Sequence, residues 1–309
     1  MALIGQPAGE GAATAPTPGW AGVGTVTLRE LSDHDNLTAA RRSDHHVLVL
    51  VTVGHGQHEI DFRSYPCRPG TLLWARPGQV VKFGGNAGLD AIVVCWEPAA
   101  VAEVAEEPAL LEGGLGPVYW QLAGEDEDAV INEVSQLVVD CQRHRSGILA
   151  AGLLRHQLAV LLLRIALLPG RAPAERNDAY VRFRLEVEKD FTRTRRVEEY
   201  AERMGYSVRT VTRACLAATG RSAKQVIDDR VTLEAMRLLA VTDDPIADIG
   251  RRLGFPEPTN FGRFFHREAG ISPGVFRTAQ RGGPRLPAQR RPVAGDPHGR
   301  PAPRVAGEA

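Results

Sequence analysis

The sequence lacks the features of several large protein classes. It has only four cysteines among 309 residues, and none stand in a C-x-x-C pair. This scarcity argues against a disulfide scaffold or a zinc knuckle and favours a reducing compartment. No uninterrupted apolar run reaches the ~18–20 residues of a membrane-spanning helix, and no secretion signal begins the chain. We therefore expect a cytoplasmic protein without a membrane partner.

Net charge is absent as well, but the zero conceals a division between two halves of the chain. Residues 1–179 carry 13 basic and 21 acidic side chains, whereas residues 180–309 carry 24 and 16. Such asymmetry indicates that the second half meets an anion such as nucleic acid. The length and the 43% apolar content fit a globular protein of two domains.

Apolar residues of the first half recur with a period near two, in short runs separated by Gly, Pro and Asn. This spacing predicts an antiparallel barrel or sandwich. The predicted strands are Thr25–Leu31, His46–Val53, Glu59–Arg63, Thr71–Ala75, Val80–Phe83 and Ala91–Trp96.

Two amphipathic helices are predicted after the strands, over Glu125–His144 and Gly147–Leu168. The second helix is apolar over more than one stripe and therefore needs cover on two sides. The barrel can supply one side. Either a second subunit or the preceding helix can cover the other side.

An internal repeat identifies the second half of the chain. Val197-x-x-Tyr200-Ala201-x-x-Met204-Gly205-Tyr206 returns forty-nine residues later as Ile246-x-x-Ile249-Gly250-x-x-Leu253-Gly254-Phe255. Each copy predicts a short helix, a left-handed glycine turn at Gly205 or Gly254, and a second helix. Ser207 is predicted to cap the second helix of the first copy, and Pro258 suits the first turn of its counterpart. Two such copies indicate paired helix-turn-helix units.

The segment between the copies, Ser222–Val241, is predicted as one amphipathic helix, followed by Asp244 as an N-cap and Pro245 as the first helical residue. About 18 residues at 1.5 Å each make a strut of roughly 27 Å. Adjacent major grooves on one face of DNA lie ~34 Å apart. A strut of this order can place two recognition helices in adjacent grooves.

Residues from about 180 to 280 resemble the AraC/XylS-type transcriptional regulators. The matching segments are Asp229-Arg230-x-x-Leu233-Glu234-Ala235-x-x-Leu238-Leu239, Ile246-Ala247-x-Ile249-x-x-x-Leu253-Gly254-Phe255, Pro258-Thr259-Asn260-Phe261-x-Arg263-Phe264-Phe265 and Gly270-x-Ser272-Pro273-x-x-Phe276-Arg277. The first copy departs from the family at Cys215, where Phe is usual, and at Leu216, where a basic residue is usual. The turns Pro69-Gly70 and Pro77-Gly78 in the first half resemble the cupin-type sensor barrel of the same family.

The resemblance implies an α+β multidomain protein, with a cupin-like antiparallel β-barrel and flanking helices followed by an all-α domain of two helix-turn-helix units. The expected segments are a disordered start (1–21), the sensor barrel (22–120), a helical dimerisation or packing segment (121–172), a linker (173–179), the DNA-binding domain (180–280) and a disordered basic, Pro-rich tail (281–309).

Six residues match family positions that face DNA base edges: Arg209, Thr212, Arg213, Thr259, Asn260 and Arg263. Arginine pairs bidentately with guanine, and asparagine with adenine. The implied partners are double-stranded DNA, a small effector in the barrel, RNA polymerase and a second copy of the chain. No cofactor is implied, and the motifs do not separate activation from repression.

One alternative is a metal-dependent cupin enzyme with an accessory DNA-binding domain. Metal-binding cupins need two His one residue apart, then a Glu, then a later His in the barrel. Here His55, His58 and Glu59 are spaced His-x-x-His-Glu, and the next His is His144. No nucleophile–base pair or phosphate loop is present in the sequence. We therefore expect neither a metal nor an enzyme, with these three residues on the surface or lining a pocket.

Overall fold

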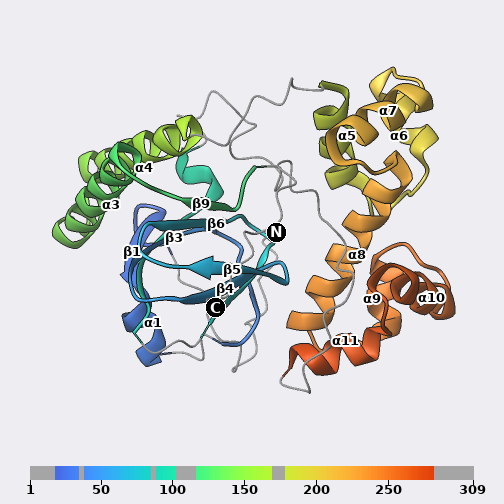
Figure 1. Cartoon of the computed structure of the whole chain (residues 1–309), viewed down its shortest axis with the longest axis horizontal. Helices are drawn as coiled ribbons and strands as arrows, with labels where there is room; N and C mark the ends of the chain where they lie inside the picture. Colours follow the sequence, from blue (N-terminus) through green and yellow to red (C-terminus); the bar gives the residue numbers. More distant parts are fainter. Residues whose placement is uncertain (1–17, 35–37, 85–87, 102–115, 169–177, 282–309) are drawn as a thin grey trace, which may run out of the picture. The chain divides into compact units, whose positions relative to one another are not determined.

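The computed structural model describes residues 18–34, 38–84, 88–101, 116–168 and 178–281. Contacts divide the chain into two compact domains, built mainly from the residues up to Leu168 and mainly from those after it (Figure 1). Most of the predicted disordered ends and of the predicted linker lies outside the described residues. Asp178 and Ala179, predicted as linker, instead begin helix α5.

Two antiparallel sheets form the N-terminal domain, as the periodicity predicts. Their strand orders are β1-β8-β3-β6-β9 and β2-β7-β4-β5. The strands are β1 (Val23–Thr27), β2 (Arg41–Arg42), β3 (His46–Val53), β4 (Gly56–Ile60), β5 (Arg63–Cys67), β6 (Thr71–Ala75), β7 (Val80–Phe83), β8 (Asp90–Trp96) and β9 (Tyr119–Gln121).

Two of the predicted strands are wrong in part. The strand predicted over Thr25–Leu31 ends at Thr27, where α1 (Leu28–His34) begins. Thr27 and Glu30 form a capping box: Thr27 N donates to Glu30 Oε2 at 2.8 Å, and Glu30 N donates to Thr27 Oγ1 at 3.2 Å. The strand predicted over Glu59–Arg63 is the hairpin β4–β5, because Asp61 and Phe62 turn the chain with φ of 48° and 64°.

The five-stranded sheet separates two hydrophobic cores. Alternating residues of β3 divide between them, since Val47 and Val49 pack toward the second sheet and Leu48 and Leu50 pack away from it. The core on the side away from the second sheet, the helix-facing core, is completed by α3 (Glu125–Arg143) and α4 (Ile148–Leu167). The bounds of these helices confirm the two predicted helices within two residues. The short helix η1 (Pro98–Val101) follows β8.

Aromatic side chains serve both cores. Trp74, Trp96 and Trp120 pack in the helix-facing core, whereas Phe83 and Tyr119 lie between the sheets. The His46 ring stacks on Trp96 with 4.9 Å between centroids. Trp74 Nε1 donates to His46 Nδ1 at 3.2 Å. Burial, aided by the nearby Arg76 charge, lowers the pKa of His46 to about 3, so this core histidine is neutral at physiological pH.

Helix α4 is, in the described part of the chain, the one helix long and apolar enough to cross a membrane by length and composition. The sequence argued against a membrane span because charged and polar residues such as Arg155 interrupt this apolar stretch. Leu154, Leu158 and Leu161 on this helix are fully buried in the core against the sheet, as in a packed helix of a globular domain.

The C-terminal domain is helical over its described residues. Its helices are α5 (Asp178–Asp190), α6 (Val197–Met204), α7 (Val208–Thr219), α8 (Ala223–Val241), α9 (Ile246–Arg252), α10 (Pro258–Ala269) and α11 (Pro273–Gln280). We call α6–α7 the first unit and α9–α10 the second unit. The predicted left-handed turns are confirmed by φ of 70° at Gly205 and 78° at Gly254.

Helix capping follows the sequence with one correction. Ser207 caps α7 by accepting a hydrogen bond from Thr210 N at 3.1 Å, and Pro258 opens α10, as predicted. Pro245, predicted as the first residue of α9, is instead its N-cap, and the helix begins at Ile246.

All four cysteines are free thiols shielded from solvent to different degrees. Cys67, Cys95 and Cys215 are buried, and Cys141 is half-buried. Burial raises the pKa of the Cys67 thiol to about 11 and those of Cys95 and Cys215 to about 12. These thiols remain protonated at physiological pH.

Candidate nucleic-acid interface

The second helix of each unit is amphipathic. On α7 the residues Val211, Ala214 and Cys215 are buried, and on α10 the residues Phe261, Phe264 and Phe265 are buried. Gly250 allows α9 to approach α10 closely, because a Cβ at this position would lie 3.0 Å from Phe261 Cβ. Each unit therefore holds its second helix by one apolar face and leaves the other face to solvent.

The six predicted contact residues fall on these outward faces. Arg209, Arg213, Thr259, Asn260 and Arg263 are exposed, while Thr212 is half-buried. Within each helix they are spaced by one turn, at 209/212/213 and 259/260/263, so each set occupies one side of its helix.

The arginines on these faces have no acidic partner in the described part of the chain. Arg213 and Arg263 occupy equivalent repeat positions, fifty residues apart because the turn of the second copy is one residue longer. Neither they nor Arg209 form an ion pair with a described residue. Neighbouring arginines behave differently: Arg252 pairs with Asp244 at 2.8 Å, and Arg251 pairs with Asp248. The outward arginines of α7 and α10 are thus available to an external anion.

A cleft of about 760 Å³ adjoins the second unit. It is formed by the loop between α5 and α6, the start of α8, the turn between α9 and α10, and α10 itself. Six basic side chains line it, against only the acidic Glu199 and Asp228: Arg193, Arg195, Arg196, Lys224, Arg263 and Arg267. Because Asn260 also lines the cleft, its positive charge lies beside two of the predicted base-contacting residues.

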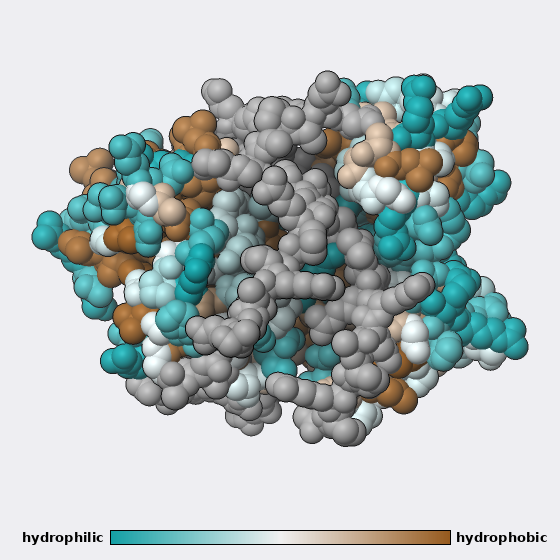
Figure 2. All heavy atoms as spheres, viewed as in Figure 1, coloured by the Kyte–Doolittle hydropathy of each residue, from teal (hydrophilic) through white to brown (hydrophobic). Residues whose placement is uncertain are grey.

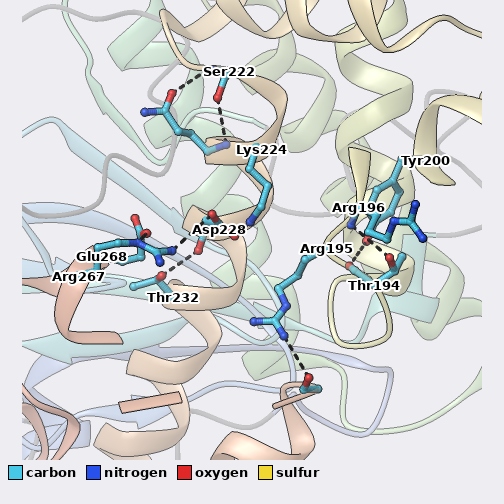
Figure 3. A network of polar contacts seen from close by, with 12 residues as sticks. Thr194, Arg195, Arg196, Tyr200, Ser222, Lys224, Asp228, Thr232, Arg267 and Glu268 are labelled. Carbon is cyan, nitrogen blue, oxygen red and sulfur yellow. Dashed lines mark hydrogen bonds and ion pairs between the residues drawn. The ribbon is translucent and has the colours of Figure 1, made fainter. Parts of the chain in front are cut away.

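Asp228 organises the wall of this cleft (Figure 3). It is buried, it forms an ion pair with Lys224, and its Oδ2 lies 3.8 Å from Arg267 Nη2. Arg267 also pairs with Glu268 at 2.7 Å. The carboxylates hold two basic side chains at the cleft edge.

Sequence reasoning did not single out the cleft residues outside the recognition helices. A signal was present, because Arg193-Thr194-Arg195-Arg196 is a dense basic run just before the first predicted helix of the repeat. Its significance depends on where the loop lies relative to α10, which spacing along the chain does not reveal.

His58 is a polar side chain buried in the interior of the N-terminal domain. His58 is buried beside Phe83, and Gly84 N donates to His58 Nδ1 at 3.1 Å. Its Nε2 is buried without a hydrogen-bond partner among the described residues. Burial lowers the pKa of His58 to about 4, so the ring is neutral. With Nδ1 accepting, the proton resides on Nε2, which is an unsatisfied donor.

No group of three His, Cys, Asp or Glu side chains in the described ranges is arranged to hold a metal ion. The three residues weighed for the cupin-enzyme alternative do not act together: His55 is exposed, His58 is buried, and Glu59 is half-buried.

Two family models match the chain. An AraC-like ligand binding domain matches residues 23–158, and a helix-turn-helix domain matches residues 200–279. Together they cover most of the sequence and contain all six predicted contact residues.

Curated relatives align over the greater part of both partners. The chain is 26% identical over 244 residues to the HTH-type transcriptional activator RhaS of Citrobacter koseri, covering 76% of this chain and 85% of that protein. Identity to the activator RhaR of Klebsiella pneumoniae is 25% over 241 residues, with the same coverage. The MmsAB operon regulatory protein of Pseudomonas aeruginosa is 24% identical over 261 residues, covering 81% and 80%.

Among solved structures, ToxT from Vibrio cholerae aligns with 83% of this chain and 98% of its own, at 10% identity and a TM-score of 0.43. The matched domain models and the aligned relatives give the family: the chain belongs to the AraC-type transcriptional regulators, with an N-terminal ligand-binding domain and a C-terminal helix-turn-helix DNA-binding domain.

Proposed function

We propose that this chain regulates transcription by placing α7 and α10 in two adjacent major grooves of DNA. The observation that carries the proposal is the pair of outward faces on equivalent helices, each with an arginine free of acidic partners in the described chain. Arg213 and Arg263 then contact guanine in their respective grooves, and Asn260 contacts adenine. Arg209, Thr212 and Thr259 complete the two faces.

The basic cleft supports this arrangement by binding the DNA backbone. Its five other basic residues share the cleft with Asn260 and Arg263. Phosphate contacts position a protein on the duplex without carrying sequence information, whereas base contacts specify the site. We therefore assign Arg193 and Arg196, both exposed, to phosphate contacts.

For the N-terminal domain we propose a small effector with a hydrogen-bond acceptor. Leaving a buried donor unsatisfied costs about 1–3 kcal/mol, which an acceptor on the effector would recover. The unpartnered His58 Nε2 between the sheets is the donor that supports this proposal. A carbonyl or carboxylate oxygen fits its chemistry.

The outer face of α4 supports a homodimer through residues 121–172. Besides its buried stripe, α4 exposes Leu149, Leu153, Val160, Leu163 and Leu167. With His156 they follow steps of four and three residues, the spacing of a coiled-coil seam. Figure 2 shows hydrophobic residues on the surface of the α3–α4 region. A helix that is apolar on two sides is normally covered on both.

The spacing of this seam favours an antiparallel pair of α4 helices. Its positions are symmetric about Leu158, so Leu149 would meet Leu167 of a second copy and Leu153 would meet Leu163. His156 would then face Val160. A parallel pair would place two His156 side chains against each other in the seam.

A substitution on this face tests the dimer. Leu163→Asp in the full chain should convert dimer to monomer at tens of micromolar in sedimentation velocity, because it buries an unpaired charge in the seam. Leu163 is 54% exposed, so the fold should survive. Arg155→Asp, on the same helix but outside the seam, is the matched control. A wild-type chain that sediments as a monomer would refute the dimer.

The relatives RhaS and RhaR are named as transcriptional activators. We accordingly propose that this chain activates transcription in the cytoplasm through contact with RNA polymerase. We do not assign it an enzymatic activity.

Selection of DNA from a random-sequence duplex library by the full chain tests the main proposal. We expect two short half-motifs whose centres lie about 10 base pairs apart. Arg213→Ala should relax one half-motif and Arg263→Ala the other, while Arg193→Ala should leave both unchanged. Enrichment of no motif, or of one unaffected by either substitution, would contradict the proposal.

A further inference from the structure

The α5–α6 loop, which leads into the first unit, touches the second unit at a point apart from the helix α8 that joins the two units. The loop between α5 and α6 reaches the turn between α9 and α10. A Cβ added at Gly254 would lie 2.3 Å from the carbonyl oxygen of Thr192. At Gly205, the equivalent turn of the first unit, no described residue lies within 4 Å of the added atom. Gly254 thus permits close docking as well as a left-handed turn.

Arg195 occupies this junction (Figure 3). Its Nη2 donates to Gly254 O at 3.1 Å. Its guanidinium carbon lies 3.7 Å from the centroid of Phe255 and 5.8 Å from that of Phe264. The Arg195 side chain therefore contacts both the backbone of the α9–α10 turn and the aromatic side chains of the second unit. A planar guanidinium is suited to stacking and donating at once.

The junction has an electrostatic anchor as well. The buried Asp228 on α8 attracts Arg195 and forms an ion pair with Arg267 on α10. Burial lowers the pKa of Arg195, and the Asp228 charge opposes that effect. The ion pair joins α8 to α10, and the charge of Asp228 favours the positive charge of Arg195 on the α5–α6 loop.

The contact of the α5–α6 loop with the second unit restricts movement between the two units more than α8 can alone. Units joined by α8 alone can swing as that helix bends, whereas a second contact beside the helix resists rotation of α10. One additional base pair between two half-sites moves the second by about 3.4 Å and turns it by about a tenth of a helical turn. A protein with fixed units cannot follow that change without losing contacts in one groove.

We propose that Arg195 is a positioning residue that sets the spacing of the DNA half-sites by locking the first unit to the turn of the second. This inference rests on the proposed reading of two grooves. It concerns which spacings the protein accepts, and Arg195 need not contact a base.

The test uses the full chain and the duplex that it selects from a random library. Affinity is measured by fluorescence anisotropy at one salt concentration, for that duplex and for versions with one base pair inserted or deleted between the half-sites. Wild type should lose about tenfold or more on either change. Arg195→Ala should bind the original duplex more weakly but lose only about threefold on changing the spacing. Arg195→Lys, which keeps charge without the stacking plane, should fall between the two.

Matched variants separate positioning from charge and from strain. Arg193→Ala removes a highly exposed charge from the same loop and should weaken binding to all three duplexes equally. Gly254→Ala should relax the spacing like Arg195→Ala, because the new methyl group displaces Thr192. Gly205→Ala carries a similar left-handed strain without that clash and should keep the wild-type spacing penalty. Circular dichroism checks that each variant is folded.

The results distinguish a failure of the proposed DNA-reading function from a failure of the proposed role of Arg195. If wild type selects no two-part site, the proposed function fails. If wild type binds a two-part site but tolerates altered spacing, or if a folded Arg195→Ala or Arg195→Lys keeps the whole spacing penalty, the lock is overturned.

Discussion

The two helix-turn-helix units share a backbone plan but secure it by different means. In the first unit, Tyr200 meets Phe183 edge-on at 5.8 Å and donates through its hydroxyl to Thr194 O at 3.0 Å. In the second unit, aromatic rings pack on one another from Phe255 to Phe276. Ser207 caps the first recognition helix, whereas Glu257 at the start of the second forms no side-chain cap.

This difference shows that a repeat can conserve geometry while exchanging the forces that maintain it. Cys215 and Phe265 occupy equivalent positions and are both fully buried, yet one is small and the other large. The first unit relies on directional hydrogen bonds at its helix start, and the second on buried area. The two units should therefore fail under different substitutions.

The largest expected contrast is between Phe265→Ala and Cys215→Ala. Removing a buried phenyl ring costs about 3–5 kcal/mol, because it loses burial and leaves a cavity. Removing one sulfur should cost about 1 kcal/mol, near the value of a single buried methylene group. Urea denaturation followed by circular dichroism measures both. Equal losses would mean that the two cores depend on packing to the same degree.

DNA affinity should show a smaller and symmetric effect. Arg213→Ala and Arg263→Ala should each weaken binding to the selected site by about 1–3 kcal/mol and relax preference at one base pair. Binding to a random duplex should change little. If specific and random duplexes weaken equally in gel-shift titrations, the arginines contact phosphate and not bases.

One of the two adjacent carboxylates on α8, that of Asp229, should make the stability of the chain depend on pH. Asp228 pairs with Arg267 of the second unit, whereas Asp229 pairs with Arg221, which follows the first unit, at 2.8 Å. Burial raises the pKa of Asp229 to about 7; Arg221 opposes this, and Glu268 and Asp228 add to it. The folded chain therefore binds this proton more tightly than the unfolded chain between about pH 4 and 7.

Stability from this group is greatest below about pH 4 and is lost as pH rises through 7. Asp229→Asn should remove that loss, so the gain in stability of the variant over wild type should be greater at pH 8 than at pH 5. Each pKa unit of the shift corresponds to about 1.4 kcal/mol. Comparing variant with wild type at each pH cancels the opposite contribution of buried His46 and His58. An unchanged difference between the two pH values would show that Asp229 is ionised in the fold.

The smallest predicted contrast lies in the caps. Ser207→Ala should cost about 1 kcal/mol, because it leaves Thr210 N without its acceptor. Glu257→Ala should stay within about 0.5 kcal/mol, since no side-chain cap is lost. Thermal unfolding of the two variants tests this directly, and a larger loss at Glu257 would reverse the assignment.

Local signals predicted much of the fold. Strands β3, β6 and β7 match their predicted bounds, and the turns at Gly205 and Gly254 follow from the repeat. Helix α1 could also have been predicted, because Thr27-Leu28-Arg29-Glu30 has the spacing of a capping box. The apolar alternation that continues to Leu31 outweighed it.

The features of the fold that the sequence did not predict depend on contacts between residues far apart in the chain. The turn at Asp61 lacks the usual glycine, and its carboxylate is held by Gln79 Nε2 at 2.6 Å and by Val80 N at 3.0 Å. The contact from Arg195 to Gly254 joins residues 59 positions apart. Both depend on how separate segments dock. The six candidate DNA contacts were accessible to sequence reasoning because the repeat and the family pattern mark them; the cleft beside them was not.

Alkylation of the buried thiols can report local unfolding in each domain. A thiol attacks alkylating reagents as the thiolate, which the raised pKa values of Cys67, Cys95 and Cys215 suppress. Cys67 and Cys95 lie in the sheet domain, and Cys215 lies in the first helix-turn-helix unit. The rate at which each is alkylated then measures how often its own surroundings unfold, so mass spectrometry of one sample would resolve the opening of the sensor from that of the DNA reader.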